Sequence, residues 1–333
     1  MEARLEEINV CYESILWQAR AVGIGVNVML RSAIVCVSIM IAIVAGQPVR
    51  AADKSNRLDC PFPAGWAAVA RQKADIVVFG ELHGTEQSPR FIGQLACALA
   101  ARGQRVLVAV EHGVTLAAAW QAAAQLPPGQ FEAALAAKGW AGRADGIGSK
   151  AYFDMLVRLQ LLKTRGLAVD FTPFAGFVDK AQNERFAHLP GQGGYEAAMA
   201  ENIAKAAKAG KYDLVLVLVG NLHARKEAIV RGSVSFESMA MQLARQAKVV
   251  SLDMRFGPGT SWNCLVKPGV VLVPQQPVRA DQMACGNSAT VGYPGFYGSP
   301  RIELASDRQA GKPRPYDGLF WVGPASGSAP LLR

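Results

Sequence analysis

Three of the four histidines in the chain come directly after short apolar runs rich in β-branched residues, a pattern typical of buried strands. His83 and His223 each close a Gly-x-x-His motif, and His112 follows Glu111. Imidazole and carboxylate groups bind divalent metal ions and transfer protons near neutral pH. Their repeated position at the ends of apolar runs predicts one site that contains several histidines and carboxylates.

Five apolar runs predict the strands of a mostly parallel sheet. They lie at 76–79, 106–110, 167–171, 214–219 and 249–252, and they are apolar on both alternating faces. This pattern is typical of strands that helices cover on both sides. In such an α/β fold the carboxyl ends of the strands form the crevice that binds ligands. We therefore expect the histidines to meet at that edge, with Asp170, Asp253 and Arg255 as further candidates for the crevice.

Segments with helical spacing separate the apolar runs. Ser88 followed by Pro89 predicts a helix that begins there and stops at Gly103, and Ser235 predicts a helix that begins just after it. Other helices are expected at 152–163 and 195–209, and an Ala-rich stretch at 116–137, interrupted by two prolines and a glycine, predicts an inserted helical pair. The alternation of apolar runs and helical segments predicts an α/β fold.

The candidate site supports two kinds of hydrolysis. In the first, His83 or His223 is a general base that activates water, Glu81 or Glu111 orients its ring, and Arg90 is the cation that stabilises the developing oxyanion. In the second, His83, Glu111 and His223 hold a divalent metal ion that lowers the pKa of its bound water. Both schemes direct water at an ester or amide bond. The chain contains no GxSxG motif for a serine nucleophile.

The N-terminal part predicts export. A short charged start from residue 29, an apolar stretch of about 13 residues at 33–45 and small residues before position 51 have the order of a secretory signal peptide, and the stretch is shorter than a membrane span. We expect a leader at 1–51, with the signal peptide at 29–51, and a single α/β domain at 52–333. A Pro/Gly-rich, irregular C-terminal tail is expected from about residue 257.

Cysteine usage agrees with export. Four cysteines remain after residue 51, and an even set in an oxidising compartment suggests two disulfides, for which three pairings exist. Cys264 and Cys285 are favoured as one pair because they lie close together in the tail. Cys60 and Cys97 form the other pair by default. The predicted location is the periplasm or the exterior of the cell, with no stable membrane anchor after cleavage.

Composition narrows the class of partner. The chain has 35 Lys and Arg against 26 Asp and Glu, a formal charge of +9, and 51% apolar residues. Disorder and a coiled coil are excluded, because apolar residues are abundant and 33 glycines and 18 prolines interrupt every heptad pattern. The positive charge is spread thinly, without a basic run, so a nucleic-acid partner is not expected. A small molecule or a peptide is the expected substrate.

The motifs resemble those of the superfamily that joins erythromycin esterases, TIKI and TraB/PrgY proteins and the ChaN haem-binding proteins. The resemblance rests on Gly80-Glu81-Leu82-His83, on Gly220-Asn221-Leu222-His223, and on Glu111 and Arg90. It runs from about residue 75 to 254, and the tail segment at 316–324 is similar to that of uncharacterised bacterial, ChaN-like members.

The resemblance implies an α/β fold with the motif residues in one pocket, but it implies more than one activity. TIKI-like members suggest a metal-dependent protease, the esterase branch suggests attack by water assisted by His and Glu, and the ChaN branch suggests haem binding. Tyr152 and Tyr195 are the candidate haem ligands under the third reading. We predict an exported bacterial hydrolase that works by one of the two schemes, with or without a bound metal ion. The alternative is a non-catalytic haem- or metal-binding protein of the periplasm.

Overall fold

The computed structural model describes residues 60–271, 279–305 and 314–332, which belong to one compact unit, Leu58–Arg333. The expected leader and signal peptide lie outside the described residues. No helix in the described part of the chain is long and apolar enough to span a membrane.

A seven-stranded sheet forms the centre of this unit, in the order β10-β11-β7-β1-β4-β2-β3. All neighbouring strands are parallel except β10 and β11, which are antiparallel. The strands are β1 (Ile76–Glu81), β2 (Val106–Gly113), β3 (Val169–Ala175), β4 (Leu214–Gly220), β7 (Val249–Gly257), β10 (Arg301–Leu304) and β11 (Gly318–Pro324). The predicted α/β class with a mostly parallel sheet is confirmed.

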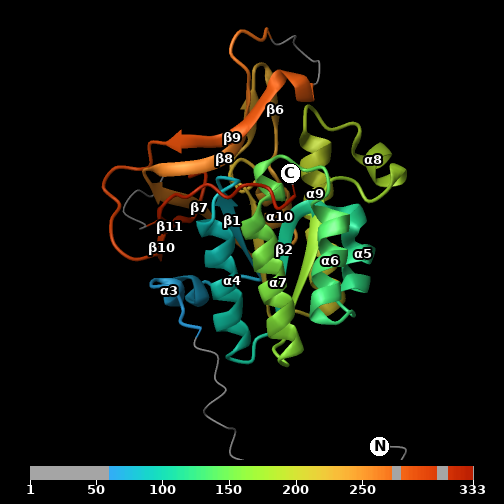
Figure 1. Cartoon of the computed structure of the whole chain (residues 1–333), viewed down its shortest axis with the longest axis vertical. Coiled ribbons are helices and arrows are strands. Elements are labelled where there is room, and N and C mark those ends of the chain that lie inside the picture. Colours follow the sequence, from blue (N-terminus) through green and yellow to red (C-terminus); the bar gives the residue numbers. More distant parts are fainter. Residues whose placement is uncertain (1–59, 272–278, 306–313, 333) are drawn as a thin grey trace, which may run out of the picture. The chain divides into compact units, whose positions relative to one another are not determined.

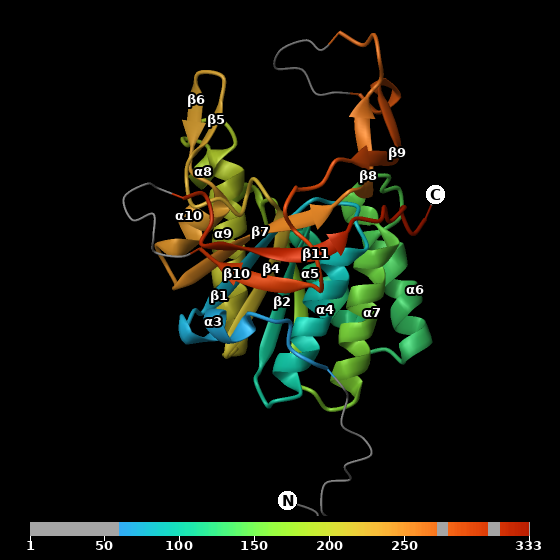
Figure 2. The ribbon, with the colours of Figure 1, turned by 90° about the vertical axis from the view of Figure 1, so that its left-hand side faces the viewer.

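Helices cover both faces of the sheet, which explains why its central strands are apolar throughout. On one face, α4 (Gln87–Ala100), α5 (Ala117–Ala123), α6 (Pro128–Gly139) and α7 (Lys150–Thr164) pack on the sheet. On the other face lie α9 (Gly193–Gly210) and α10 (Met239–Ala244). Figure 2 shows the two groups of helices on opposite sides of the strands. The shorter α3 (Trp66–Arg71) contacts β10, and α8 (Lys180–Phe186) packs on α9 (Figure 1).

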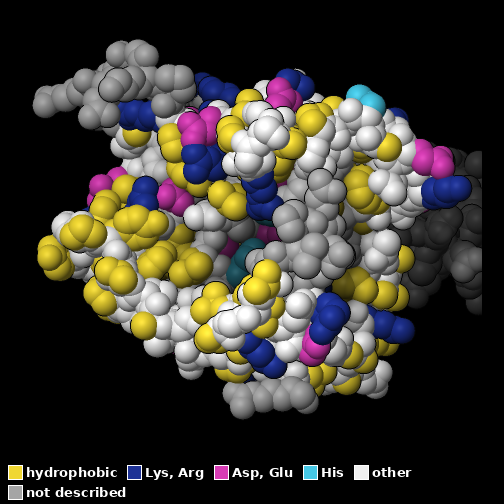
Figure 3. Space-filling view, turned by 90° about the horizontal axis from the view of Figure 1, so that it is seen from above, with side chains coloured by type: hydrophobic (Ala, Val, Ile, Leu, Met, Phe, Trp, Pro, Cys, Tyr) yellow, Lys and Arg dark blue, Asp and Glu magenta, His cyan; other side chains and the backbone are white. Residues whose placement is uncertain are grey.

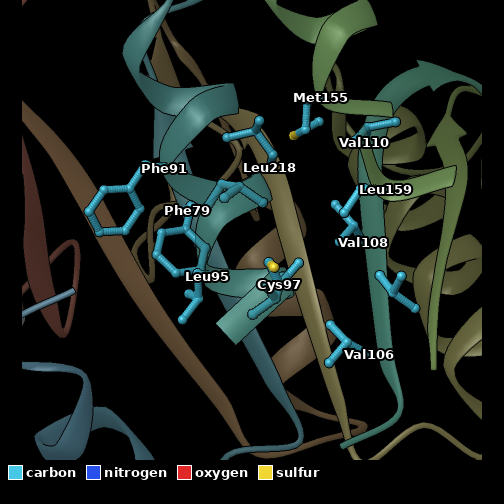
Figure 4. Packing of buried hydrophobic residues seen from close by; sticks show 14 of the residues in the cluster. Phe79, Phe91, Leu95, Cys97, Val106, Val108, Val110, Met155, Leu159 and Leu218 are labelled. Atoms are coloured by element: carbon cyan, nitrogen blue, oxygen red, sulfur yellow. The ribbon is translucent and has the colours of Figure 1, made fainter. Parts of the chain in front are cut away.

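The packing on the α4 face is aromatic and aliphatic. The ring centroid of Phe79 on β1 lies 5.2 Å from that of Phe320 on β11 and 6.2 Å from that of Phe91 on α4. Figure 4 shows Phe79 and Phe91 beside Leu95, with Val108 and other valines of β2 farther along the sheet. Because these side chains are buried, the strands that carry the site residues are held rigidly.

The prediction of an irregular C-terminal tail from about residue 257 is wrong. Residues after that point form a hairpin of β8 (Gly259–Val266) and β9 (Met283–Thr290), and β10 and β11 complete one edge of the sheet. Gly- and Pro-rich connections hide the short strands in the sequence. The strands form because β11 pairs with β7 and buries Phe320 and Trp321. A second small hairpin, β5 (Ile229–Arg231) and β6 (Val234–Phe236), was also not predicted.

Two helix starts differ from the expected ones. Ser88 lies inside the first turn of α4, and its hydroxyl donates to the Glu81 carboxylate instead of capping the helix. Phe236 pairs with Ile229 in β6, so α10 begins only after Ser238, whose hydroxyl accepts from the Met241 amide. The inserted helical pair is present as α5 and α6, and Pro128 occupies the first position of α6.

Both disulfides have the expected pairing. Cys60 joins Cys97 on α4, and Cys264 joins the directly opposite Cys285 across the β8–β9 hairpin. The first bond ties the start of the described chain to the centre of the α4 face, where Cys97 is fully buried.

We expect the double substitution Cys60→Ala with Cys97→Ala to lower the free energy of unfolding by about 4 kcal/mol, because the bond closes a loop of 37 residues in the unfolded chain. Urea denaturation of the oxidised protein and the variant measures this difference. The matched pair Cys264→Ala with Cys285→Ala, which opens a loop of 21 residues, should cost slightly less. A loss below about 1 kcal/mol in the first variant would contradict the expectation.

Candidate active site

The predicted site lies where three neighbouring strands end. β1, β4 and β2 are adjacent and parallel, and Glu81 is in register with Gly220. His83 and His223 follow β1 and β4, and Glu111 lies near the end of β2. The carboxyl ends of the strands therefore bring the four predicted residues together. Seen from above, a histidine and acidic side chains are recessed in a hollow that hydrophobic side chains border (Figure 3).

Both imidazole rings point one nitrogen at the same carboxylate. His83 Nε2 lies 3.3 Å from Oε2 of Glu111, and His223 Nε2 lies 3.6 Å from Oε1 of Glu111. The other nitrogen of each ring has a carboxylate of its own. His83 Nδ1 is 2.8 Å from Glu81 Oε1, and His223 Nδ1 is 2.6 Å from Glu196 Oε1. The site thus consists of two His–Glu dyads joined through Glu111.

Further hydrogen bonds fix the carboxylates. The Gly220 amide donates to Glu111 Oε2 over 2.7 Å, and the Met239 amide donates to Glu196 Oε2 over 2.7 Å. The Ser88 hydroxyl donates to the second oxygen of Glu81 and lies 3.1 Å from the Thr85 hydroxyl. All three glutamates are buried. These hydrogen bonds fix the orientation of the three carboxylates. The carboxylates in turn orient the two imidazole rings.

The turn after His83 is held from two sides. Gly84 has a positive φ of 73°, and an added Cβ would lie 2.0 Å from the Trp262 carbonyl oxygen of β8. The Gly84 carbonyl accepts from the amides of Trp262 and of Ser328 in the C-terminal segment. The tail that the sequence suggested to be irregular therefore supports the site.

Glu196 is the site residue that the sequence analysis missed. It lies in the first turn of α9, where an acidic residue is ordinarily explained by the helix dipole. Its position on the buried face of α9, in helical spacing with Met199 and Ile203, was the available signal. A carboxylate on such an apolar face must have a partner, and here the partner is His223.

Arg90 lies away from the two dyads. It is exposed on α4 and lines a depression between α4 and α7 with Lys150 and Arg158, and the lining includes none of the site histidines or glutamates. The turn from His83 into α4 points position 90 outward, because positions 88, 89, 91 and 92 are the buried ones. The structure therefore does not bring Arg90 to the site where the sequence analysis expected it.

The other candidates for the crevice also lie elsewhere. His112 is fully buried on the opposite face of β2 from Glu111, among the rings of Trp120, Trp140 and Tyr152. Burial lowers its pKa to about 3, so this ring is neutral. Asp170 lies near the start of β3 and pairs with Lys163.

Asp253 pairs with Arg255 at the end of β7, with its Oδ2 2.9 Å from the guanidinium. Burial raises the Asp253 pKa to about 6, although Arg255 opposes the shift. No contact joins this pair to the dyads in the described part of the chain. His188, the fourth histidine, is exposed.

Burial and the neighbouring charges act in opposite directions on the site residues. Burial lowers the pKa of His83, but the negative charges of Glu111 and Glu81 more than offset this and raise it well above 6.5. Burial likewise lowers the pKa of His223, and Glu196 and Glu111 raise it above 6.5. Burial raises the pKa of Glu111, but His83 and His223 lower it to about 2. At neutral pH the free site therefore favours protonated rings around an ionised Glu111.

The residues do not fit the metal site that the sequence analysis allowed for His83, Glu111 and His223. No group of three or more His, Cys, Asp or Glu side chains within the described ranges has a geometry that could hold a metal ion. Here the rings form ion pairs with glutamates at both nitrogens. We therefore assign no step of the chemistry to a metal ion.

The two tyrosines suggested as haem ligands differ in position. Tyr152 is fully buried in the aromatic cluster around His112. Tyr195 is partly exposed, and its ring centre lies 6.3 Å from that of His223. Tyr195 borders the site on its partly exposed side. Tyr152 borders it from the core, where burial and the charges of Glu81 and Glu111 raise the pKa of its hydroxyl well above 10.

The fold is similar to that of an esterase whose structure has been solved. A mutant of erythromycin esterase EreC in its open conformation superposes with a TM-score of 0.53 and 11% identity, over 79% of this chain and 94% of that one. The chain shares its fold with that esterase. No protein-family model and no curated protein matches the chain.

Two further solved structures have lower TM-scores. A Bacillus cereus protein has a TM-score of 0.47 and 12% identity, over 79% of this chain and 92% of that one. ChaN of Campylobacter jejuni, solved with cofacial haem, has a TM-score of 0.34 and 14% identity, over 58% of this chain and 86% of that one. The expected fold is confirmed by the likeness to the esterase, and fold alone does not fix activity.

The opposed pKa shifts predict how stability depends on pH. A histidine whose pKa is raised on folding stabilises the protein fully below pH 6.5, and this contribution is lost as the pH rises through the raised value. Glu111, whose pKa falls from 4.5 to about 2, stabilises above pH 4.5 and loses this effect as the pH falls toward 2. The contribution of the cluster is therefore largest between about pH 4.5 and 6.5.

Urea denaturation at pH 5.5 to 9 of the wild type and of the double variant His83→Gln with His223→Gln isolates this contribution as the difference between the two curves. We expect the difference to shrink as the pH rises above 6.5. The variant His188→Gln, which changes an exposed ring, should follow the wild type. A difference that grows with pH would contradict the assignment of raised pKa values.

Gly220→Ala should separate the two dyads without unfolding the protein. An added Cβ would lie 2.8 Å from His83 Nε2 and 3.6 Å from Glu111 Oε2, so the ring must move away from Glu111. We expect a cost of about 1–3 kcal/mol in unfolding free energy and a fall in the pKa of His83. Histidine ring NMR titration measures the second effect. The control Gly129→Ala in α6 meets no atom within 4 Å, and should leave the His83 pKa unchanged.

Proposed function

We propose that this protein is a hydrolase that uses the two His–Glu dyads to direct water at an ester or amide bond of a small molecule or peptide. The observation that carries the proposal is the convergence of His83 Nε2 and His223 Nε2 on Glu111, while Glu81 and Glu196 hold the Nδ1 atoms. A pair of oriented rings is able to supply both a base and an acid, which is what hydrolysis by water requires.

The dyads define the position of each proton. A carboxylate at Nδ1 keeps a proton on that nitrogen, so Nε2 is the atom that accepts or donates a proton toward the hollow. In the proposed reaction one of the two rings, His83 or His223, loses its Nε2 proton to solvent and then accepts one from the attacking water, whose oxygen bonds to the carbonyl carbon. The other ring stays protonated at Nε2 and donates to the leaving oxygen or nitrogen as its bond to carbon breaks. Glu111 remains ionised and stabilises whichever ring is protonated.

The distances suit such exchange. The separations of 3.3 and 3.6 Å between Nε2 atoms and Glu111 exceed the 2.7–3.2 Å of a normal N–H···O hydrogen bond, whereas both Nδ1 contacts are short. The Nε2 sides are thus the looser ones, where water or substrate is able to enter. The fold shared with an esterase supports this choice of reaction class.

Export is part of the proposal. Two disulfides connect the described cysteines, and such bonds persist in oxidising compartments. Together with the signal peptide expected at 29–51, they support a periplasmic or secreted bacterial protein. The alternative, a haem-binding protein of the ChaN type, is included as an outcome of the test below, with Tyr195 as its candidate ligand.

We expect His83→Ala and His223→Ala each to lower kcat at least 100-fold on a panel of p-nitrophenyl esters and p-nitroanilide peptides, because each removes a proton-transferring group. The far-ultraviolet circular dichroism should be unchanged, and His188→Ala should keep full activity. Wild-type kcat should rise with pH above 6.5, since a base must first lose its proton.

Equal turnover in the wild type and both site variants would rule out this mechanism. A titration with haem tests the alternative in the same samples. A Soret band that Tyr195→Phe abolishes, in a protein that hydrolyses none of the panel, would favour haem binding.

A further inference from the structure

The segment from Arg143 to Gly148 lies directly on the turn that carries His83. It joins α6 to α7 and includes the short 3-10 helix Gly146–Gly148. A Cβ added at Gly146 would lie 2.5 Å from the Gly84 amide nitrogen and 2.8 Å from the His83 carbonyl carbon. The Trp262 indole of β8 donates to the Ala144 carbonyl over 2.8 Å. The segment is therefore fixed at the site by contacts on two sides.

Arg143 is the cation of this segment, and Asp145 holds it in place. Arg143 Nε lies 3.2 Å from Asp145 Oδ1, and Arg143 Nη2 lies 3.0 Å from Asp145 Oδ2, so the two side chains form a bidentate ion pair. Asp145 Oδ1 also accepts from the Gly148 amide over 3.0 Å. A guanidinium has five N–H donors, so three remain after this pair is made. No other partner of the Arg143 guanidinium occurs in the described parts of the chain.

The charges of this pair act on residues that border the site. Burial raises the pKa of Tyr195, which is next to Glu196, to about 12, and the positive charge of Arg143 opposes that shift. Burial raises and Arg143 lowers the pKa of Asp145, and the positive charge of His83 lowers it further. Arg143 thus acts on Tyr195, and the charge of His83 acts on Asp145. The pair also acts on His112, whose pKa is lowered by burial and by Arg143 and raised by Asp145.

The site needs a cation for the reaction proposed above. Three glutamates face two histidines, so the dyads and Glu111 together stay negative even when both rings are protonated. Attack by water places a negative charge on the substrate oxygen, which such a site disfavours unless a positive donor is present. Arg90 lies in the depression between α4 and α7 and does not meet this need. The Asp145 side chain is 47% exposed against 32% for Arg143, so solvent screens the carboxylate more than the guanidinium.

We infer that Arg143 is the oxyanion-binding residue of this site, and that its free N–H groups bind the negatively charged oxygen of a tetrahedral intermediate. The inference rests on the proposed hydrolase function, and it assigns to the segment between α6 and α7 the role that the sequence suggested for Arg90. Its ligand class, a tetrahedral oxyanion, also allows a test that does not depend on turnover.

Phenylphosphonate, a stable tetrahedral anion, is the probe for this test. Isothermal titration calorimetry of the full chain should show binding to the wild type, at least tenfold weaker binding to Arg143→Met, and an intermediate affinity for Arg143→Lys, which keeps the charge but not the fork. Arg90→Ala is the matched control and should bind like the wild type. Thermal melting and circular dichroism check that each variant is folded.

Kinetics on the p-nitrophenyl esters give a second readout. Loss of an oxyanion donor should lower kcat about 100-fold in Arg143→Met, with a smaller change in KM. Failure of wild-type protein to bind phenylphosphonate, or equal affinity in wild type and Arg143→Met, would overturn the inference. Binding that depends on Arg143, in a protein that hydrolyses neither the esters nor the p-nitroanilide peptides, would sustain the anion site and refute the hydrolase.

Discussion

Glu111 is 7% exposed and ionised, so its charge has to be balanced inside the protein. His83, His223 and the Gly220 amide provide that balance from three directions. The two rings in turn carry raised pKa values because Glu111 lies between them and a second carboxylate lies behind each. Most of the properties of the site follow from this one buried carboxylate.

The sheet makes the arrangement possible at little cost in conformational freedom. β1, β4 and β2 are neighbours with apolar side chains on both faces, so their ends are held in fixed register. Gly220 has no side chain where a Cβ would meet His83, and Gly80 leaves room for Ala224 of the loop that carries His223. The two Gly-x-x-His motifs are thus a steric requirement for bringing two rings close to one strand end.

Adjacent residues on β2 show how strand geometry selects between chemistry and packing. Glu111 and His112 point to opposite faces, because side chains alternate along a strand. Glu111 meets the imidazole rings, whereas His112 enters a cluster with Trp120, Trp140 and Tyr152 and stays neutral. Neither ring nitrogen of His112 has a hydrogen-bond partner in the described regions, so this histidine contributes to the core as an aromatic ring.

The sequence by itself predicted five strands, their parallel arrangement and four members of the site, because apolar runs and the residues directly after them are local patterns. It favoured the observed cysteine pairs among the three pairings that were possible. Tertiary structure alone decided what depended on distant segments. The partner of His223 is Glu196, 27 positions away on a helix of the other face. The segment from Arg143 to Gly148 lies on the turn after His83 because Gly146 packs against Gly84. Arg90, although nearer in sequence, turns outward with the helix. The sequence did not predict β11, because a short strand between Gly- and Pro-rich segments is stabilised by the strand it pairs with, here β7.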